Sequence, residues 1–473
     1  VSVDLGNVTT IGYEAFRECP ALESVTGNAV TTVDGKAFRY CTSLVDVTFP
    51  NATTVGEWTF GDCTSLQTIS LPKLTSIGEH VFQYSSVESV SMPELTTLSA
   101  NAFYECADLN SVYLPKVTEI REKAFGFTDS LVELELPSVI KVGSRAFEKT
   151  SIKNLDLSKV TSLGEGAFES SDIVSINIDT VEAIPDSCFN NCFDLQTVLV
   201  SNLKSIGFES FKSCNSLGTI DFAHNIISCG KDAFSACDAI TEVTFNNLTE
   251  LADGAFYGCD GLITFVAPEL TKIGDDALRG CESLVTVDIP KIEYIGFNAF
   301  INSFDKNVGT SITFYSRNVK LMYSFLDDDG PNDGTADTLI SYIKEVKCYQ
   351  GSTADNPRLY PEGTRIVYLE ETTDEDGYYL YAVEGGYLHI DLDNGIVVKA
   401  DDTVTSAVIP ETIEGVPITI IGEGAFEGLT NLDWLNPIHA EYITEIRDSA
   451  FANCTTCPII TSDRLKYIGN KAF

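Results

Sequence analysis

The residues of this chain that could carry chemistry are fourteen cysteines, four histidines and a large excess of carboxylates. Cys454 and Cys457 form the lone C-x-x-C pair, and because no histidine stands beside it, the spacing does not indicate a zinc site. The histidines lie in separate segments, and none has a serine or cysteine nucleophile at a spacing typical of a catalytic triad. They are His80, His224, His389 and His439. We therefore expect incidental histidines, no catalytic residue, and no metal or other cofactor.

Pairs and groups of carboxylates are the second chemical possibility. Glu133 and Glu135 could imitate the acid and base of a glycosidase, but we expect no pocket and no flanking aromatic residues around them. Two groups of aspartates could hold calcium, and they are Asp327, Asp329 and Asp333, and Asp391 and Asp393. Neither group has the twelve-residue spacing and closing glutamate of an EF-hand loop. We interpret both as acidic turns, with calcium binding as the alternative, and predict that the chain is not an enzyme.

The charge balance excludes two classes of partner. Thirty Lys and Arg against sixty-nine Asp and Glu leave a formal net charge of −39. A surface of that sign repels the phosphates of nucleic acids and the anionic head groups of membranes, so we expect neither as a partner. No run of the sequence approaches the ~18 consecutive apolar residues of a membrane-spanning helix.

Phenylalanine recurs at a regular spacing, which identifies an internal repeat. The segments IGYEAFRECPAL, VGEWTFGDCTSL and IGFESFKSCNSL begin at Ile11, Val55 and Ile206 and share one template. Its Phe position recurs fourteen times at spacings of 21 to 23 residues, with Leu278 as the one substitute, and three more times near the C-terminus. The phenylalanines are Phe16, Phe38, Phe60, Phe82, Phe103, Phe125, Phe147, Phe168, Phe189, Phe211, Phe234, Phe256, Phe300, Phe426, Phe451 and Phe473.

The apolar positions of the template predict a solenoid. Counted from the Phe as zero, they fall at −8, −5, −1, 0, +3, +6, +9 and +11. So many apolar residues in one coil are buried only when coils stack on one another. Positions +9 and +11 alternate as in a short parallel strand, and Pro50, Pro72 and Pro93 end three such strands. Glycine at −4 in most copies predicts a turn with positive φ before a short helical segment.

Most of the cysteines obey the same template. Ten of them occupy position +3, and they are Cys19, Cys41, Cys63, Cys106, Cys192, Cys214, Cys237, Cys259, Cys281 and Cys454. Free cysteine is among the most buried residue types, so we interpret them as reduced thiols that fill the core. The alternative is a ladder of disulfides between coils, which the parallel side-chain directions of stacked coils suit poorly.

The repeat unit IGxxAFxxCxxLxxVxLPxxLTx resembles the BspA-like leucine-rich repeats of bacterial and some protist surface proteins. The resemblance covers about 350 of 473 residues. The segment from Lys347 to Glu371 resembles the tail that closes such an array, and Tyr378 to Phe426 resembles the hairpin-rich lead-in that opens one. The resemblance implies an α/β repeat solenoid, a right-handed superhelix with one short parallel strand per coil of ~22 residues. It also implies a secreted or cell-surface protein that binds other proteins and has no catalytic activity.

The resemblance and the composition together predict two arrays. We expect an array with an irregular, tail-like closing segment over residues 1–371, an acidic linker at 372–377, and a hairpin-rich lead-in with the start of a second array at 378–473. Turn signals at Asp376-Gly377 and Asn394-Gly395 predict hairpins in the lead-in. Because both ends of the chain fall inside a repeat, we expect a segment of a longer protein, with a head-to-tail filament as the alternative.

Positions +8 and +10 flank the inward residue of each predicted strand and therefore point outward. We call the surface that they form between Ser24 and Asp288 the strand face. It contains no Lys or Arg, seven acidic residues, and mostly Ser or Thr besides. The candidate partner-binding residues are Asp46, Tyr113, Glu133, Glu135, Asp156, Asp221, Glu242 and Asp288. The expected partner is a protein or glycoprotein on another surface, that of a host or of a second copy of this chain. The alternative is a solvated face without a partner.

Overall fold

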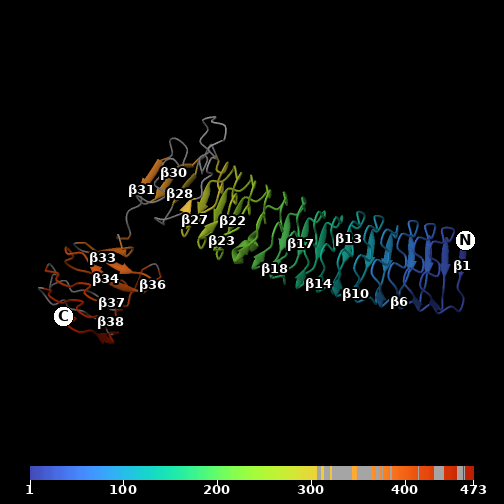
Figure 1. The fold of residues 1–473 in the computed structure, drawn as a ribbon, viewed down its shortest axis with the longest axis horizontal. Coiled ribbons are helices and arrows are strands. Elements are labelled where there is room, and N and C mark those ends of the chain that lie inside the picture. Colours follow the sequence, from blue (N-terminus) through green and yellow to red (C-terminus); the bar gives the residue numbers. More distant parts are fainter. Residues whose placement is uncertain are drawn as a thin grey trace, which may run out of the picture. The chain divides into compact units, whose positions relative to one another are not determined.

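The computed structural model describes residues 1–305, 310–313, 320–321, 343–348, 365–368, 373–374, 376–383, 386–413, 415–430, 442–454, 462 and 464–473. The chain divides into two compact units, Val1–Tyr368 and Leu369–Phe473. In the first unit the coils stack in chain order, each upon the one before it (Figure 1).

Nearly every coil of the first unit contributes a strand that pairs in parallel with its equivalent one coil away. In β11 and β13, for example, Ser111 lies opposite Glu133 and Tyr113 opposite Glu135. These strands are β1 (Ser2–Asp4), β3 (Ser24–Thr26), β5 (Asp46–Thr48), β7 (Thr68–Ser70), β9 (Ser89–Ser91), β11 (Ser111–Tyr113), β13 (Glu133–Glu135), β15 (Asn154–Asp156), β17 (Ser175–Asn177), β19 (Thr197–Leu199), β22 (Glu242–Thr244), β24 (Thr264–Val266), β26 (Thr286–Asp288), β28 (Thr310–Thr313), β30 (Ile343–Cys348) and β31 (Arg365–Tyr368). The predicted solenoid with parallel strands is confirmed.

A second, two-residue strand in each coil was not predicted. It holds an outward residue at −6 and an inward aliphatic residue at −5, which is too short a segment for alternation to be visible in the sequence. These strands are β2 (Thr10–Ile11), β4 (Thr32–Val33), β6 (Thr54–Val55), β8 (Ser76–Ile77), β10 (Thr97–Leu98), β12 (Glu119–Ile120), β14 (Lys141–Val142), β16 (Ser162–Leu163), β18 (Ala183–Ile184), β20 (Ser205–Ile206), β21 (Ser228–Cys229), β23 (Glu250–Leu251), β25 (Lys272–Ile273), β27 (Tyr294–Ile295) and β29 (Lys320–Leu321). They form parallel sheets of their own.

The Ala-Phe segment of each coil forms turns rather than the expected short helix. In the third coil Trp58 (φ 55°) and Asp62 (φ 59°) adopt the left-handed conformation on either side of Phe60. The backbone N–H groups of these three residues donate to carbonyl oxygens of the next coil at 3.0, 2.9 and 2.8 Å. The segment is therefore a third line of hydrogen bonds between coils. The described residues hold a single 3₁₀ helix, η1 (Asp221–Asn225), in another part of the coil.

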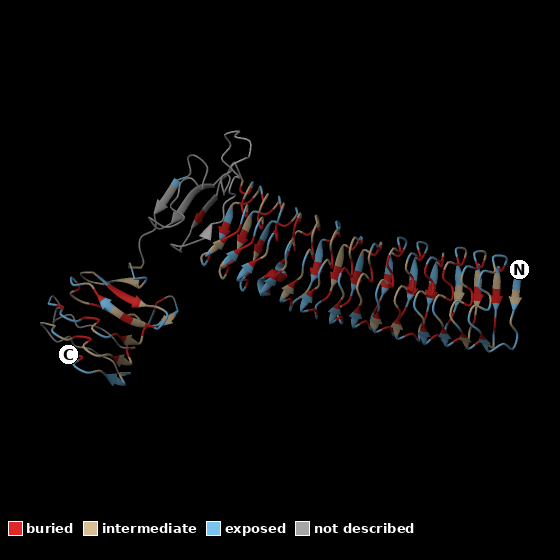
Figure 2. Cartoon of the chain, viewed as in Figure 1, coloured by how far each residue is buried: buried red, intermediate tan, exposed pale blue. Residues whose placement is uncertain are grey.

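The repeated phenylalanines form a continuous stack along the first unit. From Phe16 to Phe256, twelve rings follow one another with centroids 5.1–5.6 Å apart and planes within 16° of parallel. Buried positions recur in each coil as a band inside the stack (Figure 2). This confirms that the repeat positions form the core.

The cysteines at +3 pack in or against the cores of the two units, as predicted. All of them except Cys19, which lies in the first coil, donate a hydrogen bond from Sγ to the carbonyl of the Phe one coil earlier. The Sγ–O distances are 3.2 Å from Cys63 to Phe38 and 2.9 Å from Cys106 to Phe82. Burial raises the pKa of the Cys106 and Cys259 thiols to about 12, so neither thiol is ionised at neutral pH. They are packing residues and not nucleophiles.

The glycines at −4 have a different cause from the one predicted. Positive φ occurs at −2 and +2, and none is found at Gly56, Gly78 or Gly164. Instead, a Cβ on Gly78 would lie 2.2 Å from the backbone nitrogen of Glu57 in the preceding coil. Glycine is required here because the backbones of neighbouring coils meet.

The second unit begins with an antiparallel meander and continues as parallel coils. Its strands are β32 (Tyr379–Val383), β33 (Gly386–Asp391), β34 (Ile396–Ala400), β35 (Thr412–Ile413), β36 (Val416–Pro417), β37 (Ile420–Ile421), β38 (Glu445–Ile446) and β39 (Tyr467–Ile468). The predicted turn at Asn394-Gly395 joins β33 to β34, with Gly395 at φ 65°. The rings of Phe426, Phe451 and Phe473 stack at 4.9 and 5.3 Å, which repeats the core of the first unit.

Candidate functional site

Seven of the eight predicted partner-binding residues lie on strands of the strand face, and one does not. Asp46 lies on β5, Tyr113 on β11, both Glu133 and Glu135 on β13, and the other three on β15, β22 and β26. The prediction that Asp221 lies on such a strand is wrong, because its coil has the 3₁₀ helix η1 where the other coils have a strand. That coil separates Phe211 from Phe234 by 23 residues, and the extra residue accompanies the loss of the strand.

The structure does not bring the seven residues together in one sheet. The strand face lies on three hydrogen-bonded sheets: β3 to β13 in the first, β15, β17 and β19 in the second, and β22, β24 and β26 in the third. The first sheet ends at β13, before a coil of 21 residues, although two other coils of that length keep their strands paired. Asp156 therefore lies in a different sheet from Glu133 and Glu135.

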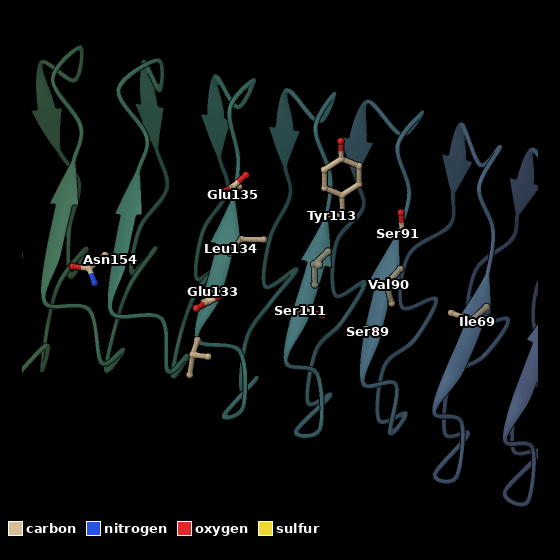
Figure 3. A pocket seen from close by; sticks show the side chains of 12 residues that line it. Ile69, Ser89, Val90, Ser91, Ser111, Tyr113, Glu133, Leu134, Glu135 and Asn154 are labelled. Carbon is tan, nitrogen blue, oxygen red and sulfur yellow. The ribbon is translucent and has the colours of Figure 1, made fainter.

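A shallow hollow of about 790 Å³ lies on the strand face between β7 and β15 (Figure 3). We call it the Tyr113 hollow, and it is lined by Ile69, Ser89, Val90, Ser91, Ser111, Val112, Tyr113, Val132, Glu133, Leu134, Glu135 and Asn154. The parallel register makes one row of Ser91, Tyr113 and Glu135. The expectation that Glu133 and Glu135 have no pocket and no aromatic neighbour is therefore wrong, because Tyr113, 56% exposed, stands beside Glu135.

The carboxylates of the hollow are unopposed, unlike those on the turns. On the turns, a lysine often pairs with a carboxylate one coil away, as in Lys116–Glu94 at 2.7 Å and Lys204–Glu182 at 3.0 Å. Within the described part of the chain, neither Glu133 nor Glu135 has an ion pair or a hydrogen bond through its side chain. The two charges on β13 therefore act outward, toward solvent.

Two of the other acidic residues of the strand face, Asp46 and Asp156, accept hydrogen bonds within the chain. Thr68 donates a hydrogen bond to Asp46 at 2.6 Å, and the backbone N–H of Ser158 donates to Asp156 at 3.0 Å. Glu242 and Asp288 have no side-chain partner among the described residues either, but each is the one acidic residue of its strand. Glu133 and Glu135 differ from them because they stand together on one strand.

The repeats of the sequence match the family model described as BspA type Leucine rich repeat region. Six copies match, over residues 2–110, 96–202, 182–305 and 400–473, which is well over half of the chain. The chain belongs to the BspA-type leucine-rich repeat family. Repeats of this type are typically non-enzymatic.

A solved structure supports the fold of this BspA-type protein. A leucine-rich repeat protein from Bacteroides ovatus ATCC 8483 is similar over 78% of this chain and 92% of its own, with a TM-score of 0.51 and 21% identity. A leucine rich cell surface protein from Faecalibacterium prausnitzii A2-165 aligns over 60% of this chain and 83% of its own, with a TM-score of 0.38 and 24% identity. A search of the curated proteins finds no match.

Two histidines of the BspA-type chain have structural roles that the sequence did not reveal. The His80 ring stacks on Trp58 with centroids 4.4 Å apart, and the guanidinium of Arg39 lies 3.8 Å from the Trp58 ring centroid. Trp58 and His80 occupy the same template position in consecutive coils, so the repeat contained the signal for this contact.

His389 on β33 is held between two aspartates. Its Nδ1 contacts Asp374, and its Nε2 lies 2.9 Å from Oδ1 of Asp401. Backbone N–H groups of Tyr378 and Tyr387 each donate to one of these carboxylates at 2.9 Å. Both ring nitrogens are thus engaged by carboxylates, so the cluster ties the segment before β32 and the loop after β34 to β33. The tie also places Asp374, within the predicted linker, against the second unit.

The cluster shifts the pKa values of its members in opposite directions. Burial disfavours the charged His389, but hydrogen bonds to Asp401 and Asp374 outweigh this, so its pKa is raised. Burial also disfavours the charged aspartates, but the bonds to His389 prevail, so the pKa values of Asp374 and Asp401 are lowered.

These shifts predict a pH dependence of the second unit's stability. The stabilisation that His389 contributes is fully present below pH ~6.5, the pKa of an unfolded histidine, and is lost as the pH rises through the raised pKa of the folded state. The stabilisation that the two aspartates contribute is present above pH ~3.9 and is lost as the pH falls through their lowered pKa values. We expect the melting temperature of this unit to fall by ~3–6 °C between pH 6 and pH 9.

The measurement is thermal unfolding of the whole chain, with amide exchange of β32–β34 to identify the unit. The His389→Gln variant should lose this alkaline dependence, whereas His224→Gln, at an exposed position in η1, should keep it. An unchanged pH profile in His389→Gln would show that the cluster does not stabilise the unit.

Of the two groups of aspartates considered as possible calcium sites, the structure describes the one at Asp391 and Asp393. Asp391 accepts hydrogen bonds from the backbone N–H and side-chain amide of Asn394, as an acidic turn does. Asp327, Asp329 and Asp333 lie outside the described residues. In the part of the chain that the structure describes, no group of three or more His, Cys, Asp or Glu is placed to hold a metal ion. The same residues include no helix long and apolar enough to span a bilayer.

Proposed function

We propose that this chain is a secreted or cell-surface protein that binds another protein or glycoprotein through its strand face. Membership of the BspA-type family, whose repeats resemble those of bacterial surface proteins, supports this location. The observation that carries the binding role is the pair Glu133 and Glu135, which project unopposed from a face without Lys or Arg.

Two kinds of surface on the same coils differ in how their charges are paired. Lysines on the turns neutralise their acidic neighbours, as Lys291 does for Glu269 at 2.8 Å. Exposed pairs of this kind contribute little stability, so their arrangement is free to vary. On the strand face, by contrast, Glu133 and Glu135 repel each other and have no side-chain partner among the described residues. A face of unopposed charge steers and selects a partner of complementary charge.

The test is charge reversal at Glu133→Lys together with Glu135→Lys, measured as capture of proteins from cell-surface extracts by the immobilised chain. We expect capture to fall at least ~10-fold, because each reversal replaces an attraction by a repulsion. The matched control reverses the same charge at Asp108 and Glu122, which are exposed on turns of neighbouring coils. If both variants lose capture equally, or neither loses it, the strand face is not the binding surface.

The same experiment addresses self-assembly as the competing role. If the only captured protein is this chain, and light scattering shows polymers of the wild type, the strand face serves assembly and not recognition of a foreign surface.

A further inference from the structure

We propose that the Tyr113 hollow is a seat for one cationic side chain, an arginine or lysine that an extended segment of the partner carries. The proposal rests on the proposed function and specifies the chemistry of the partner. Three observations support it: no cation among the described residues lies over the Tyr113 ring, two carboxylates stand beside this ring, and hydroxyl groups line the rest of the hollow.

Five of the six other tyrosines between residues 1 and 305 have a cation over the ring, and Tyr113 has none among the described residues. Lys36 lies 5.3 Å from the ring centroid of Tyr13, and Arg279 lies 5.8 Å from that of Tyr257. Arg39, Lys123 and Lys272 lie at 4.7, 5.8 and 6.0 Å from the rings of Tyr40, Tyr104 and Tyr294, respectively. The sixth, Tyr84, packs against the ring of Tyr104 instead, with centroids 6.3 Å apart. Most tyrosines of this part of the first unit thus receive a cation from their own or an adjacent coil.

Tyr113 is 56% exposed, and within the described residues no Lys or Arg lies over its ring. The row that contains it continues with Ser91 on one side and Glu135 on the other. None of the twelve residues that line the hollow is basic. A cation that lies over the Tyr113 ring must therefore come from a partner.

The register places the two carboxylates where such a cation needs them. Adjacent parallel strands lie ~4.8 Å apart, so the Glu135 side chain stands beside the Tyr113 ring. Glu133 projects from the same side of β13, ~7 Å along the strand (Figure 3). A guanidinium over the ring would meet a carboxylate at its edge, which combines a cation–π contact with a charge-assisted hydrogen bond. Arginine fits this geometry better than lysine because its planar group does both at once.

The rest of the hollow suits an extended segment. The four hydrogen-bonded strands β7, β9, β11 and β13 span ~14 Å, the length of about four or five extended residues. Ser89, Ser91 and Ser111 offer hydroxyl groups, and Asn154 an amide, to the backbone of such a segment. Val132, 51% exposed at the rim, offers an apolar contact to the aliphatic part of the arginine.

The experiment measures binding of two synthetic peptides, Ser-Thr-Arg-Thr-Ser and the same peptide with citrulline in place of arginine, by calorimetry with the whole chain. Citrulline keeps the shape of arginine and removes its charge. We expect the arginine peptide to bind at least ~10-fold more tightly, and Tyr113→Ala to weaken it ~5-fold. Glu133→Gln with Glu135→Gln should abolish the preference for arginine.

The controls separate the seat from the long-range field of a chain with net charge −39. Asp108→Asn with Glu122→Gln removes the same charge from exposed turns and should leave the preference intact. Tyr257→Ala, which removes a tyrosine already under Arg279, should leave it intact as well. Circular dichroism and melting temperature verify that each variant is folded.

Three results would overturn the seat: equal binding of the two peptides, equal losses in the hollow and control variants, or displacement of the arginine peptide by a neutral oligosaccharide such as maltohexaose. If the seat fails while reversal at Glu133 and Glu135 still abolishes capture, the strand face remains a binding surface. If both fail, the proposed function fails with it.

Discussion

Phe125→Ala is expected to lower the free energy of unfolding by about 3–5 kcal/mol. The ring is fully buried, and its centroid lies 5.6 Å from that of Phe103 and 5.4 Å from that of Phe147. In a solenoid each coil is stabilised mainly by its two neighbours, so the cavity weakens both interfaces of this coil. Urea unfolding followed by circular dichroism measures the loss.

The matched control for this variant is Phe193→Ala. Phe193 is a phenylalanine of the same unit but is 57% exposed and outside the stack. Its replacement should change stability by less than ~0.5 kcal/mol. If the two variants unfold at the same urea concentration, the phenylalanine stack does not hold the coils together.

Gly78→Ala is expected to destabilise the chain by about 3 kcal/mol or more, although it adds one methyl group. The new Cβ would stand 2.2 Å from the backbone nitrogen and 2.5 Å from the Cα of Glu57, and neither atom is a side-chain atom that could move aside. The coils would separate where the Gly78 N–H donates to the Val55 carbonyl at 2.8 Å. Thermal unfolding and limited proteolysis between the third and fourth coils would report the change.

The chain contains its own control for this effect. Gly12 occupies the same template position in the first coil, but a Cβ there would meet nothing within 4 Å. Gly12→Ala should therefore melt within a degree or two of the wild type, a change of less than ~0.5 kcal/mol. Equal melting temperatures for the two variants would contradict the explanation of the repeated glycine as a close approach of coils.

The sequence predicted best those features that every copy repeats. The stack of Phe rings, the buried cysteines and the parallel strand at +8 to +10 follow from one template, because the same burial problem recurs in each coil. The second strand of each coil escaped prediction because two residues do not reveal a period of two. The glycines were placed correctly but explained wrongly, since only coordinates show that Gly78 approaches Glu57.

Features that occur in a single coil were harder to predict. Nothing in the template announced that η1 replaces the strand at Asp221, or that the sheet breaks between β13 and β15. The tie between Asp374, His389 and Asp401 joins residues that no repeat relates. The candidate site could be predicted in part. Alternation indicated that Tyr113, Glu133 and Glu135 face outward, but the hollow around them is lined by five strands whose arrangement the alternation does not reveal.

The measurement that tests the strand face most directly is carboxyl footprinting of the chain, free and bound to a captured partner, with a carbodiimide and an amine label. Modification of Glu133 and Glu135 should fall at least ~5-fold in the complex, because a partner that pairs with a carboxylate shields it from the reagent. Modification of Asp108 and Glu122 on the turns should be unchanged. Protection of the turn residues with full modification of Glu133 and Glu135 would contradict binding through the strand face.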